Sequence, residues 1–363
     1  MIFRIAQPVL VGAIVLLASK SAASSSAGGG VAPTPSSWRQ RADSVINEID
    51  VRRILSTLAA DSMEGRLTGS PGADRAARFI DREMRSIGII PAGDSGYYQK
   101  VALAMKPGGC CRQAVMVVLD SMGALATYPE SARRIGYNLI GVINGSDPVL
   151  RDQIVVIASH YDHLGIGTPV NGDSIYNGAD DDASGITAVL EIARSLATGP
   201  RPKRTVVFIT TTGEEEGILG TRWYVAHPAF PLSKMVAEME VEMIGRPDSL
   251  AGGTGKAWLT GYDRSTMGDM LKADGVPIVA DPYPQMHFFE RSDNIVFAQM
   301  GIPAHTLSSY NLHNDYHAVT DDVDRIDFPH VTGVIRAGAS AARILANGEK
   351  PSWKAGGCPA PRC

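Results

Sequence analysis

Histidine and acidic side chains gather in five short segments of the sequence, at or just beyond the ends of predicted strands. The segments span residues 158–163, 177–185, 210–217, 240–246 and 314–321. Imidazole nitrogens and carboxylate oxygens are common zinc ligands. Together the segments supply two candidate histidine ligands, His160 and His317, and at least three carboxylates, which is more than one catalytic zinc needs. They match a centre in which two zinc ions share a bridging aspartate.

The two histidines each have an acid at a spacing that could orient the imidazole. His160 ends an apolar run and precedes Asp162 by two residues, so the carboxylate can hold the second ring nitrogen. His317 precedes Asp321 by four residues. A single buried histidine is more often a hydrogen-bonded core residue than a ligand, so the prediction depends on all five segments together.

The carboxylates offer more than one interpretation. The run 180–182 consists of three aspartates that repel one another unless a cation neutralises them, although a solvated loop that caps the next helix is the alternative. Glu214 and Glu215 can divide two tasks, metal binding and proton transfer, or simply lie at a helix N-terminus. Glu240 and Glu242 alternate on a predicted strand and therefore point to the same face.

The elements that must position these residues alternate between strands and helices. Short β-branched runs predict strands at 115–119, 138–143, 154–158, 206–211, 236–243 and 304–307. Helical spacing predicts helices at 46–58, 73–87, 183–197, 219–226, 265–273, 295–300 and 330–345. This order predicts an α/β fold: a single domain with a mixed, mostly parallel central sheet flanked by helices on both faces. Such sheets place ligand sites at the carboxyl ends of their strands.

The two ends of the chain differ in composition from the predicted catalytic domain between them. Residues 1–23 have the layout of a signal peptide, whose apolar stretch is shorter than the roughly 20 residues of a spanning helix. We therefore expect an exported protein, periplasmic or extracellular, with no stable membrane insertion after signal cleavage. Residues 24–40 predict a flexible linker rich in Ser, Gly and Pro. The catalytic domain is expected at 41–350, followed by a loose C-terminal tail at 351–363.

The net charge bears on possible partners, and the cysteines bear on disulfide bonds. Lys and Arg total 34 against 38 Asp and Glu, a formal net charge of −4 that makes nucleic acid an unfavourable partner. Cys110, Cys111, Cys358 and Cys363 allow three pairings. Their spacing matches no zinc or redox motif, so structural disulfides are expected in an oxidising compartment.

The order of the segments along the chain and their residue sequences resemble those of a known family. ASHYDHLG (158–165), GADDDASG (178–185), GEEEGILGT (213–221), EMIGR (242–246) and NDYH with the later Asp321 are similar to the motifs of di-zinc metallopeptidases of clan MH, family 28, of the bacterial leucyl aminopeptidase type. The flanking sequences at 62–80, 291–305 and 321–327 are also similar to those of the family. The resemblance covers nearly the whole chain from about residue 50 to residue 328.

The resemblance implies a role for each matching metal ligand. Asp181 would bridge two Zn²⁺ ions, His160 and Glu242 would hold one ion, and Glu215 and His317 the other. All five positions keep a donor atom, which argues against a catalytically inactive relative. Glu242 stands where Asp is commoner in the family, so the spacing or affinity of that site is in question.

The resemblance also implies a reaction. Glu214 would be the general base for a metal-bridging hydroxide that attacks the peptide carbonyl, and Tyr316 would help to stabilise the oxyanion. Asp162 would hold and orient the ligand His160, and Asp321 would do the same for His317. Asp182 and Asn294 depart from the usual Asn and His at their positions.

The expected activity is removal of the N-terminal residue from peptide substrates. A carboxypeptidase or dipeptidase is an alternative, with Arg246 and Arg291 as candidates to bind the substrate carboxylate. A glutaminyl cyclase, which uses one zinc on a similar fold, is another. From a different class, a non-catalytic peptidase-like binding ectodomain is the remaining alternative.

Overall fold

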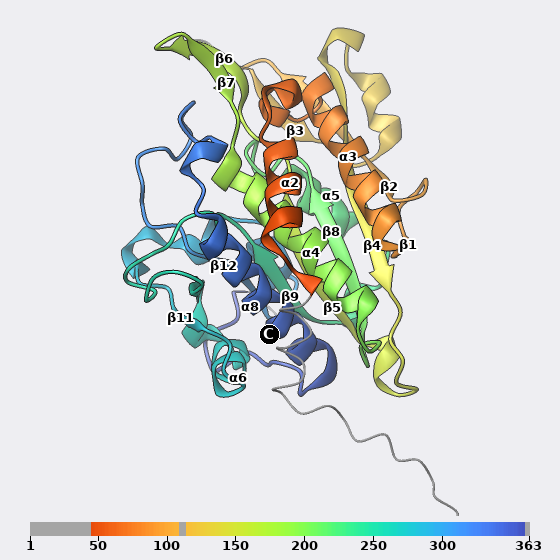
Figure 1. The fold of residues 1–363 in the computed structure, drawn as a ribbon. Coiled ribbons are helices and arrows are strands. Elements are labelled where there is room, and N and C mark those ends of the chain that lie inside the picture. The colour runs from red at the N-terminus through yellow and green to blue at the C-terminus, as the bar shows by residue number, and fades with distance from the viewer. Residues whose placement is uncertain (1–44, 109–113, 360–363) are drawn as a thin grey trace, which may run out of the picture. The chain divides into compact units, whose positions relative to one another are not determined.

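A ten-stranded mixed sheet runs through the computed structural model, which describes residues 45–108 and 114–359 (Figure 1). The strands lie in the order β11-β10-β12-β9-β5-β8-β4-β2-β3, with β1 paired to β4. Their bounds are β1 Ile90–Pro91, β2 Tyr98–Lys106, β3 Val115–Val118, β4 Arg133–Ile143, β5 Ile154–His160, β8 Thr205–Thr211, β9 Met235–Val241, β10 Ala257–Leu259, β11 Ile278–Ala280 and β12 Ala304–Ser308.

The centre of the sheet is parallel. Strands β12, β9, β5 and β8 are neighbours and all run in the same direction. Beyond them, β4 is antiparallel to β8, and β2 is antiparallel to β4. Every residue of β5 and β8 is buried, as expected for strands covered on both faces. The carboxyl ends of these four strands therefore lie along one edge of the sheet.

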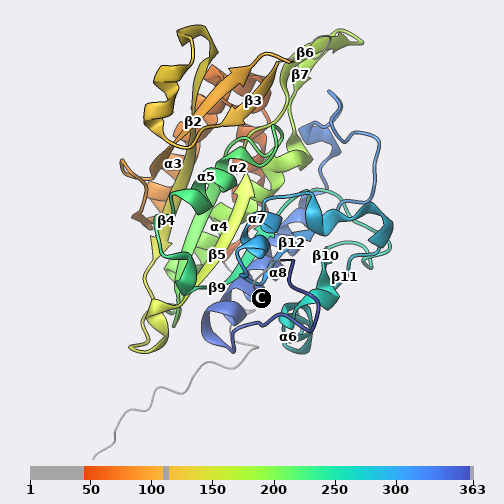
Figure 2. The ribbon, with the colours of Figure 1, turned by 180° about the vertical axis from the view of Figure 1, so that it is seen from behind.

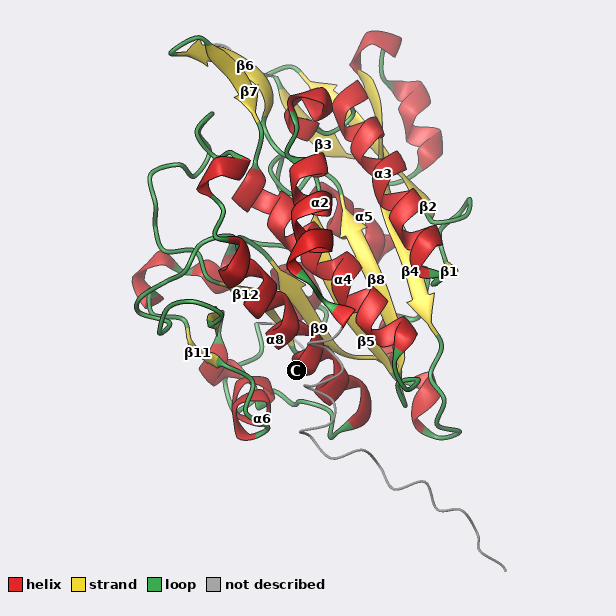
Figure 3. Ribbon diagram, in the orientation of Figure 1, coloured by secondary structure: helices red, strands yellow, loops and turns green. Residues whose placement is uncertain are grey.

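Helices cover both faces. One face carries α2 (Glu48–Leu58), α3 (Pro71–Ile87), α4 (Gly185–Thr198) and α8 (Phe328–Asn347). The opposite face, turned forward in Figure 2, carries α5 (Leu219–Ala226) and α7 (Asn294–Gln299). The remaining helix, α6 (Met267–Ala273), packs near β11. The predicted single mixed α/β sheet, parallel at its centre and flanked by helices, is confirmed (Figure 3).

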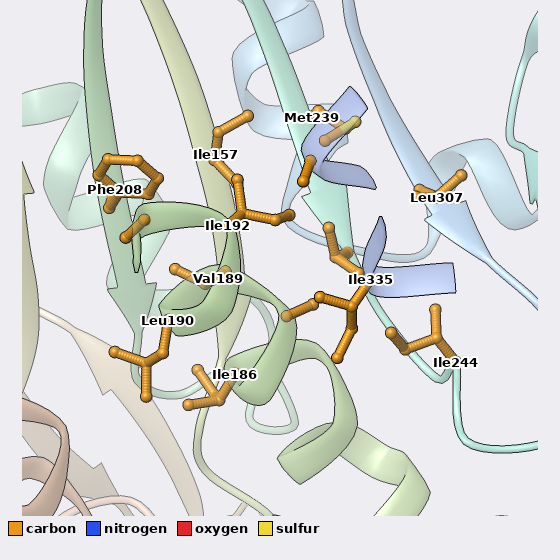
Figure 4. Packing of buried hydrophobic residues seen from close by; sticks show 14 of the residues in the cluster. Ile157, Ile186, Val189, Leu190, Ile192, Phe208, Met239, Ile244, Leu307 and Ile335 are labelled. Atoms are coloured by element: carbon orange, nitrogen blue, oxygen red, sulfur yellow. The ribbon is translucent and has the colours of Figure 1, made fainter. Parts of the chain in front are cut away.

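The core between α4 and the sheet fixes the helix that follows the aspartate run. Val189 and Ile192 of α4 lie against Ile157 of β5 and Phe208 of β8 in one fully buried cluster (Figure 4). Fully burying such a side chain stabilises the fold by about 1.5–3 kcal/mol. This packing holds the start of α4 firmly above the sheet edge.

Several elements differ from the expectations. Strands β1, β2, β10 and β11, and the hairpin of β6 (Gly165–Val170) and β7 (Asp173–Tyr176), were not predicted. β2 contains Lys, Gln, Ala and Met in place of a β-branched run, and β10 and β11 have three residues each, too few for a pattern.

The expectation of a loose C-terminal tail is wrong for residues 351–359, which pack against the domain. Trp353 pairs with Ser265 in a β-bridge, and its indole Nε1 donates to the Gly301 carbonyl at 2.9 Å. Its ring also lies edge-on to Phe289. Packing of one large aromatic side chain thus anchors a stretch whose composition is otherwise typical of a tail.

The predicted signal peptide and linker, residues 1–40, lie outside the described residues, as do Cys110, Cys111 and Cys363. Cys358 is disulfide-bonded. Within the described ranges, no helix combines the length and apolar character needed to cross a bilayer.

Candidate metal centre

The proposed ligands come together at the carboxyl edge of the parallel strands. His160 is the last residue of β5, Glu242 directly follows β9, and Glu215 follows β8 by four residues. Asp181 lies in the short helical segment Ala179–Ser184 that precedes α4, and His317 lies in the loop after β12. Topology alone therefore places the five ligand-bearing segments on one edge.

Asp181 lies at the centre of the arrangement. His160 Nε2 is 3.3 Å from Asp181 Oδ1, and His317 Nε2 is 3.2 Å from Asp181 Oδ2. Glu242 offers a carboxylate oxygen within 4.8 Å of the ligand atoms of His160 and Asp181. Glu215 Oε2 lies 3.0 Å from His317 Nε2. The two histidines thus face opposite oxygens of one carboxylate, as a bridging ligand requires.

A third histidine, which the sequence analysis did not select, also belongs to the centre. His163 is fully buried, and its Nδ1 lies 2.7 Å from Glu215 Oε1 and 3.9 Å from Asp181 Oδ2. Its ring lies edge-on to that of His317. The signal was present in the sequence, since His163 follows His160 by three residues beyond the same strand.

Arg66, also missed, builds the loop that carries Asp181. Its buried guanidinium donates to the backbone carbonyls of Asn177 and Gly178 at 2.5 and 2.9 Å. Gly178 has a φ of +57°, and a Cβ there would lie 2.2 Å from the Asp181 carbonyl oxygen. From the other side, the Asp321 carboxylate accepts the backbone N–H groups of residues 180 and 181 at 3.0–3.1 Å.

Asp162 connects the first and third segments. Its carboxylate accepts the backbone N–H groups of Glu214 and Glu215 at 3.2 and 3.3 Å. His160 Nδ1 lies 3.2 Å from the backbone carbonyl oxygen of Asp162 and 3.8 Å from its carboxylate oxygen Oδ1. Asp162 thereby fixes both a histidine and the two glutamates.

The two residues that depart from the family pattern have structural contacts. Asp182 accepts the Ser159 hydroxyl at 2.6 Å and the backbone N–H groups of Gly185 and Met243. Asn294 donates to the Phe289 carbonyl and accepts the Thr306 hydroxyl. Neither side chain is in either group of possible metal ligands among the described residues.

Burial and neighbouring charges shift the pKa values of the ionisable groups in the centre in different directions. Burial lowers the pKa of His160, but its contacts with Asp162 and Asp181 outweigh burial and raise the pKa well above its ordinary value. Burial raises the pKa of Asp181, yet hydrogen bonds from His160 and His317 hold it well below the usual range. Burial raises the pKa of Glu242 to about 7 and that of Glu214 well above its ordinary value.

The donor set fits metal ions. The Nε2 atoms of His160, His163 and His317 are buried and make no well-aligned hydrogen bond to the protein. Carboxylate oxygens lie 3.0–3.3 Å from Nε2 of His160 and of His317. Two overlapping groups of ligand atoms result, one with His160, Asp181 and Glu242 and one with His163, Asp181 and Glu215, which His317 also contacts. Nitrogen and oxygen donors in this combination suit zinc.

A pocket opens directly onto this centre. Its reactive wall contains Asp181, Glu214, Glu242 and Tyr316, and the ring of Tyr316 stacks on His317 with centroids 3.8 Å apart. The rest of the lining combines aromatic, hydroxyl and cationic side chains: Trp258, Phe288, Tyr310, Thr260, Ser292, Thr306, Ser308, Met243 and Arg291.

Curated proteins of two kinds are similar in sequence to this chain. The chain is 32% identical over 248 residues to the probable leucine aminopeptidase 2 of Aspergillus fumigatus, covering 66% of this chain and 46% of that protein. It is 24% identical over 231 residues to a vacuolar membrane protease of Candida dubliniensis, covering 64% of this chain and 23% of that protein. The chain thus spans less than half the length of these two curated relatives.

Solved structures share the fold. The aminopeptidase from Aneurinibacillus sp. strain AM-1 superposes with a TM-score of 0.60 at 17% identity, covering 86% of this chain and 97% of that one. Glutaminyl cyclase of Porphyromonas gingivalis superposes with a TM-score of 0.56 at 14% identity, covering 82% and 98%. The sequence profile of Peptidase family M28 matches residues 138–340, more than half of the 363 residues. The chain therefore belongs to peptidase family M28.

Proposed function

We propose that this protein is a secreted zinc aminopeptidase that removes the N-terminal residue of peptides. Two Zn²⁺ ions would be held by His160, Asp181 and Glu242, and by Asp181, Glu215 and His317. The observation that carries the proposal is that His160 and His317 face opposite oxygens of the Asp181 carboxylate.

Zinc, when bound, supplies a Lewis acid that polarises a carbonyl and lowers the pKa of a coordinated water to about 7. The protein supplies the proton transfers. Glu214 lines the pocket and is in neither ligand group, so its carboxylate is free to take a proton from water and return it to the leaving amine. Burial raises the pKa of Glu214 well above its ordinary value, which favours the protonated form once the proton has been taken up.

Tyr316 is placed to stabilise charge on the reacting carbonyl oxygen. Burial raises the pKa of its phenol far above the ordinary value, so the hydroxyl stays protonated and remains a hydrogen-bond donor. Stacking on His317 fixes the direction of the ring. A preformed donor of this kind stabilises a developing oxyanion without reorganisation.

A free N-terminal amine suits the pocket because three carboxylates line it and attract an ammonium group. The disulfide at Cys358 supports an exported location, since such bonds persist in oxidising compartments. The name of the Aspergillus relative, a probable leucine aminopeptidase, supports the same reaction.

The test uses the purified chain with its zinc counted by mass spectrometry. We expect about two zinc ions per chain and release of leucine from leucyl-glycinamide, with no cleavage of the N-acetylated peptide. Cleavage of acetylated peptides from the carboxyl end would indicate a carboxypeptidase. Cyclisation of glutaminyl peptides with one zinc per chain would indicate a cyclase. Zinc-independent peptide binding without turnover would indicate a binding ectodomain.

A further inference from the structure

Two arginines near the centre differ in what balances their charge. Arg246 is mostly buried and forms ion pairs with Asp315 at 2.6 Å and Asp321 at 3.6 Å. Those acids satisfy its charge and tie it to the loop that supports Asp181. Arg246 is therefore unsuited to bind a substrate carboxylate.

Arg291 lines the pocket and has no acidic partner among the described ion pairs. It follows the Phe288–Glu290 turn, and its guanidinium carbon lies 5.1 Å from the centroid of the Phe288 ring. Tyr310 and Tyr316 line the same pocket as Arg291. Burial raises the pKa of both phenols, and the Arg291 charge opposes that rise. Arg291 is exposed, so a ligand in the pocket can reach its guanidinium.

Arg291 offers a cation that no described acid pairs with, in a pocket that also has an aromatic wall. Arginine presents parallel N–H groups that match a carboxylate in a bidentate pair.

We propose that Arg291 binds a carboxylate of the substrate, so that the enzyme prefers peptides with a carboxylate close to the cleaved bond. The inference rests on the proposed aminopeptidase function. The carboxylate can come from two sources, the C-terminus of a dipeptide or an acidic side chain on the first residue. Trp258, Phe288 and Tyr310 would contact the apolar part of the same substrate.

The experiment compares kcat/KM for leucyl-glycine, leucyl-glycinamide and glutamyl-glycinamide in wild type and Arg291→Ala. We expect the wild type to prefer one of the two carboxylate-bearing peptides over leucyl-glycinamide. Which of them is preferred identifies the source. Arg291→Ala should reduce that preference about 10–100-fold, which is the value of a charge-assisted hydrogen bond. Arg291→Lys should restore part of it.

The control is Arg264→Ala, which removes an arginine that also stacks on an aromatic ring, Phe289, but is not among the pocket-lining residues. Its substrate preference should equal that of wild type. A wild type without preference, or an Arg291→Ala variant with unchanged preference, would overturn the inference. Zinc-dependent hydrolysis of leucyl-glycinamide by wild type tests the aminopeptidase function separately.

A second inference comes from the contacts of Glu215. Its two oxygens point to different histidines, with Oε1 2.7 Å from His163 Nδ1 and Oε2 3.0 Å from His317 Nε2. The geometry points to His163 as a positioning residue that donates from Nδ1 to Oε1, so that Oε2 faces His317 and Asp181. This inference also rests on the proposed zinc ligands, whose outer hydrogen bonds orient them and tune affinity.

Zinc affinity, measured by competition with a chromogenic chelator, tests this role. His163→Ala should weaken one of two zinc sites about 10–100-fold. His163→Asn, whose side-chain amide can donate in place of Nδ1, should recover most of the affinity. The exposed His227, replaced by Ala, is the control. If His163→Ala lowers the thermal midpoint in chelator but binds both zinc ions normally, the role is only structural and the inference fails.

Discussion

Neighbouring glutamates of identical chemistry acquire different properties in this centre. Burial and the charge of Asp181 raise the pKa of Glu215, but hydrogen bonds to His163 and His317 outweigh them and lower it. Burial instead raises the pKa of Glu214, with no histidine hydrogen bond to offset it. Glu215 is therefore ready to bind a cation as a carboxylate, whereas Glu214 is suited to carry a proton.

Replacing Glu214 tests this division. Glu214→Gln should lower kcat by a factor of about 10² or more, since that is the contribution of a general base. Zinc content should stay at the wild-type value because Glu214 is not among the grouped ligand atoms. The half-buried neighbour Glu216, replaced by Gln, serves as control and should keep most of its turnover. Normal turnover in Glu214→Gln would remove the residue from the mechanism.

The bridging aspartate gives a different expectation. Asp181→Ala should lower both zinc content and rate, because both histidines contact its carboxylate. Metal analysis of the purified variant checks this expectation. The matched control is Asp180→Asn, which changes the neighbouring aspartate. Zinc stoichiometry equal to wild type in Asp181→Ala would contradict a bridging role.

At the scale of elements, β9 carries acids on the face opposite the α4 core. Glu238 and Glu240 are fully buried, and their carboxylate oxygens have no hydrogen-bond partner within the described part of the chain. Burial raises the pKa of both well above the ordinary value. The sequence predicted that Glu240 and Glu242 share a face of this strand, and the structure places Glu240 in β9 and Glu242 directly after it.

The raised pKa of Glu238 makes stability depend on pH. Between the unfolded and folded pKa values the folded state binds more protons, so this carboxyl group stabilises the fold at low pH and the contribution is lost as pH rises. Glu238→Gln should therefore gain stability relative to wild type by up to about 1.4 kcal/mol per pH unit above pH 5. Urea unfolding at several pH values measures this. Parallel stability curves for the two proteins would contradict it.

The elements that the sequence predicted well are those with strong local patterns. β5, β8, β9 and β12 and the helices α2 to α8 of the described residues follow from β-branched runs and helical spacing. The strands that were missed depend on pairing with neighbours rather than on their own residues. The same holds in the centre, because Arg66 acts on carbonyls more than 100 residues away, and no local pattern reports such contacts.

At the scale of the whole molecule, four strands, two loops and one helix start converge on a single edge. Each carboxylate there is buried close to others, and such clustering is unfavourable without a cation. The residue types of the proposed ligands came from the sequence, and their roles stay a prediction. His163 lies in the first segment but was not selected, because its contact with Glu215 depends on the fold.

Zinc should accordingly stabilise the fold. Removal of metal with a chelator should lower the thermal midpoint by several degrees, since a ligand at 100 times its Kd contributes about 2.7 kcal/mol. Differential scanning calorimetry with and without added zinc measures the shift. The Asp181→Ala variant should show little zinc-dependent shift, and an equal shift in both proteins would contradict stabilisation through this centre.

The most direct test of the central claim is a crystal structure of the zinc-loaded protein with anomalous data at the zinc edge. The account predicts two peaks about 3.5–4 Å apart, one on each side of the Asp181 carboxylate. One peak should contact His160 and Glu242, and the other Glu215 and His317. A single peak, or peaks away from Asp181, would contradict a two-zinc centre bridged by this residue.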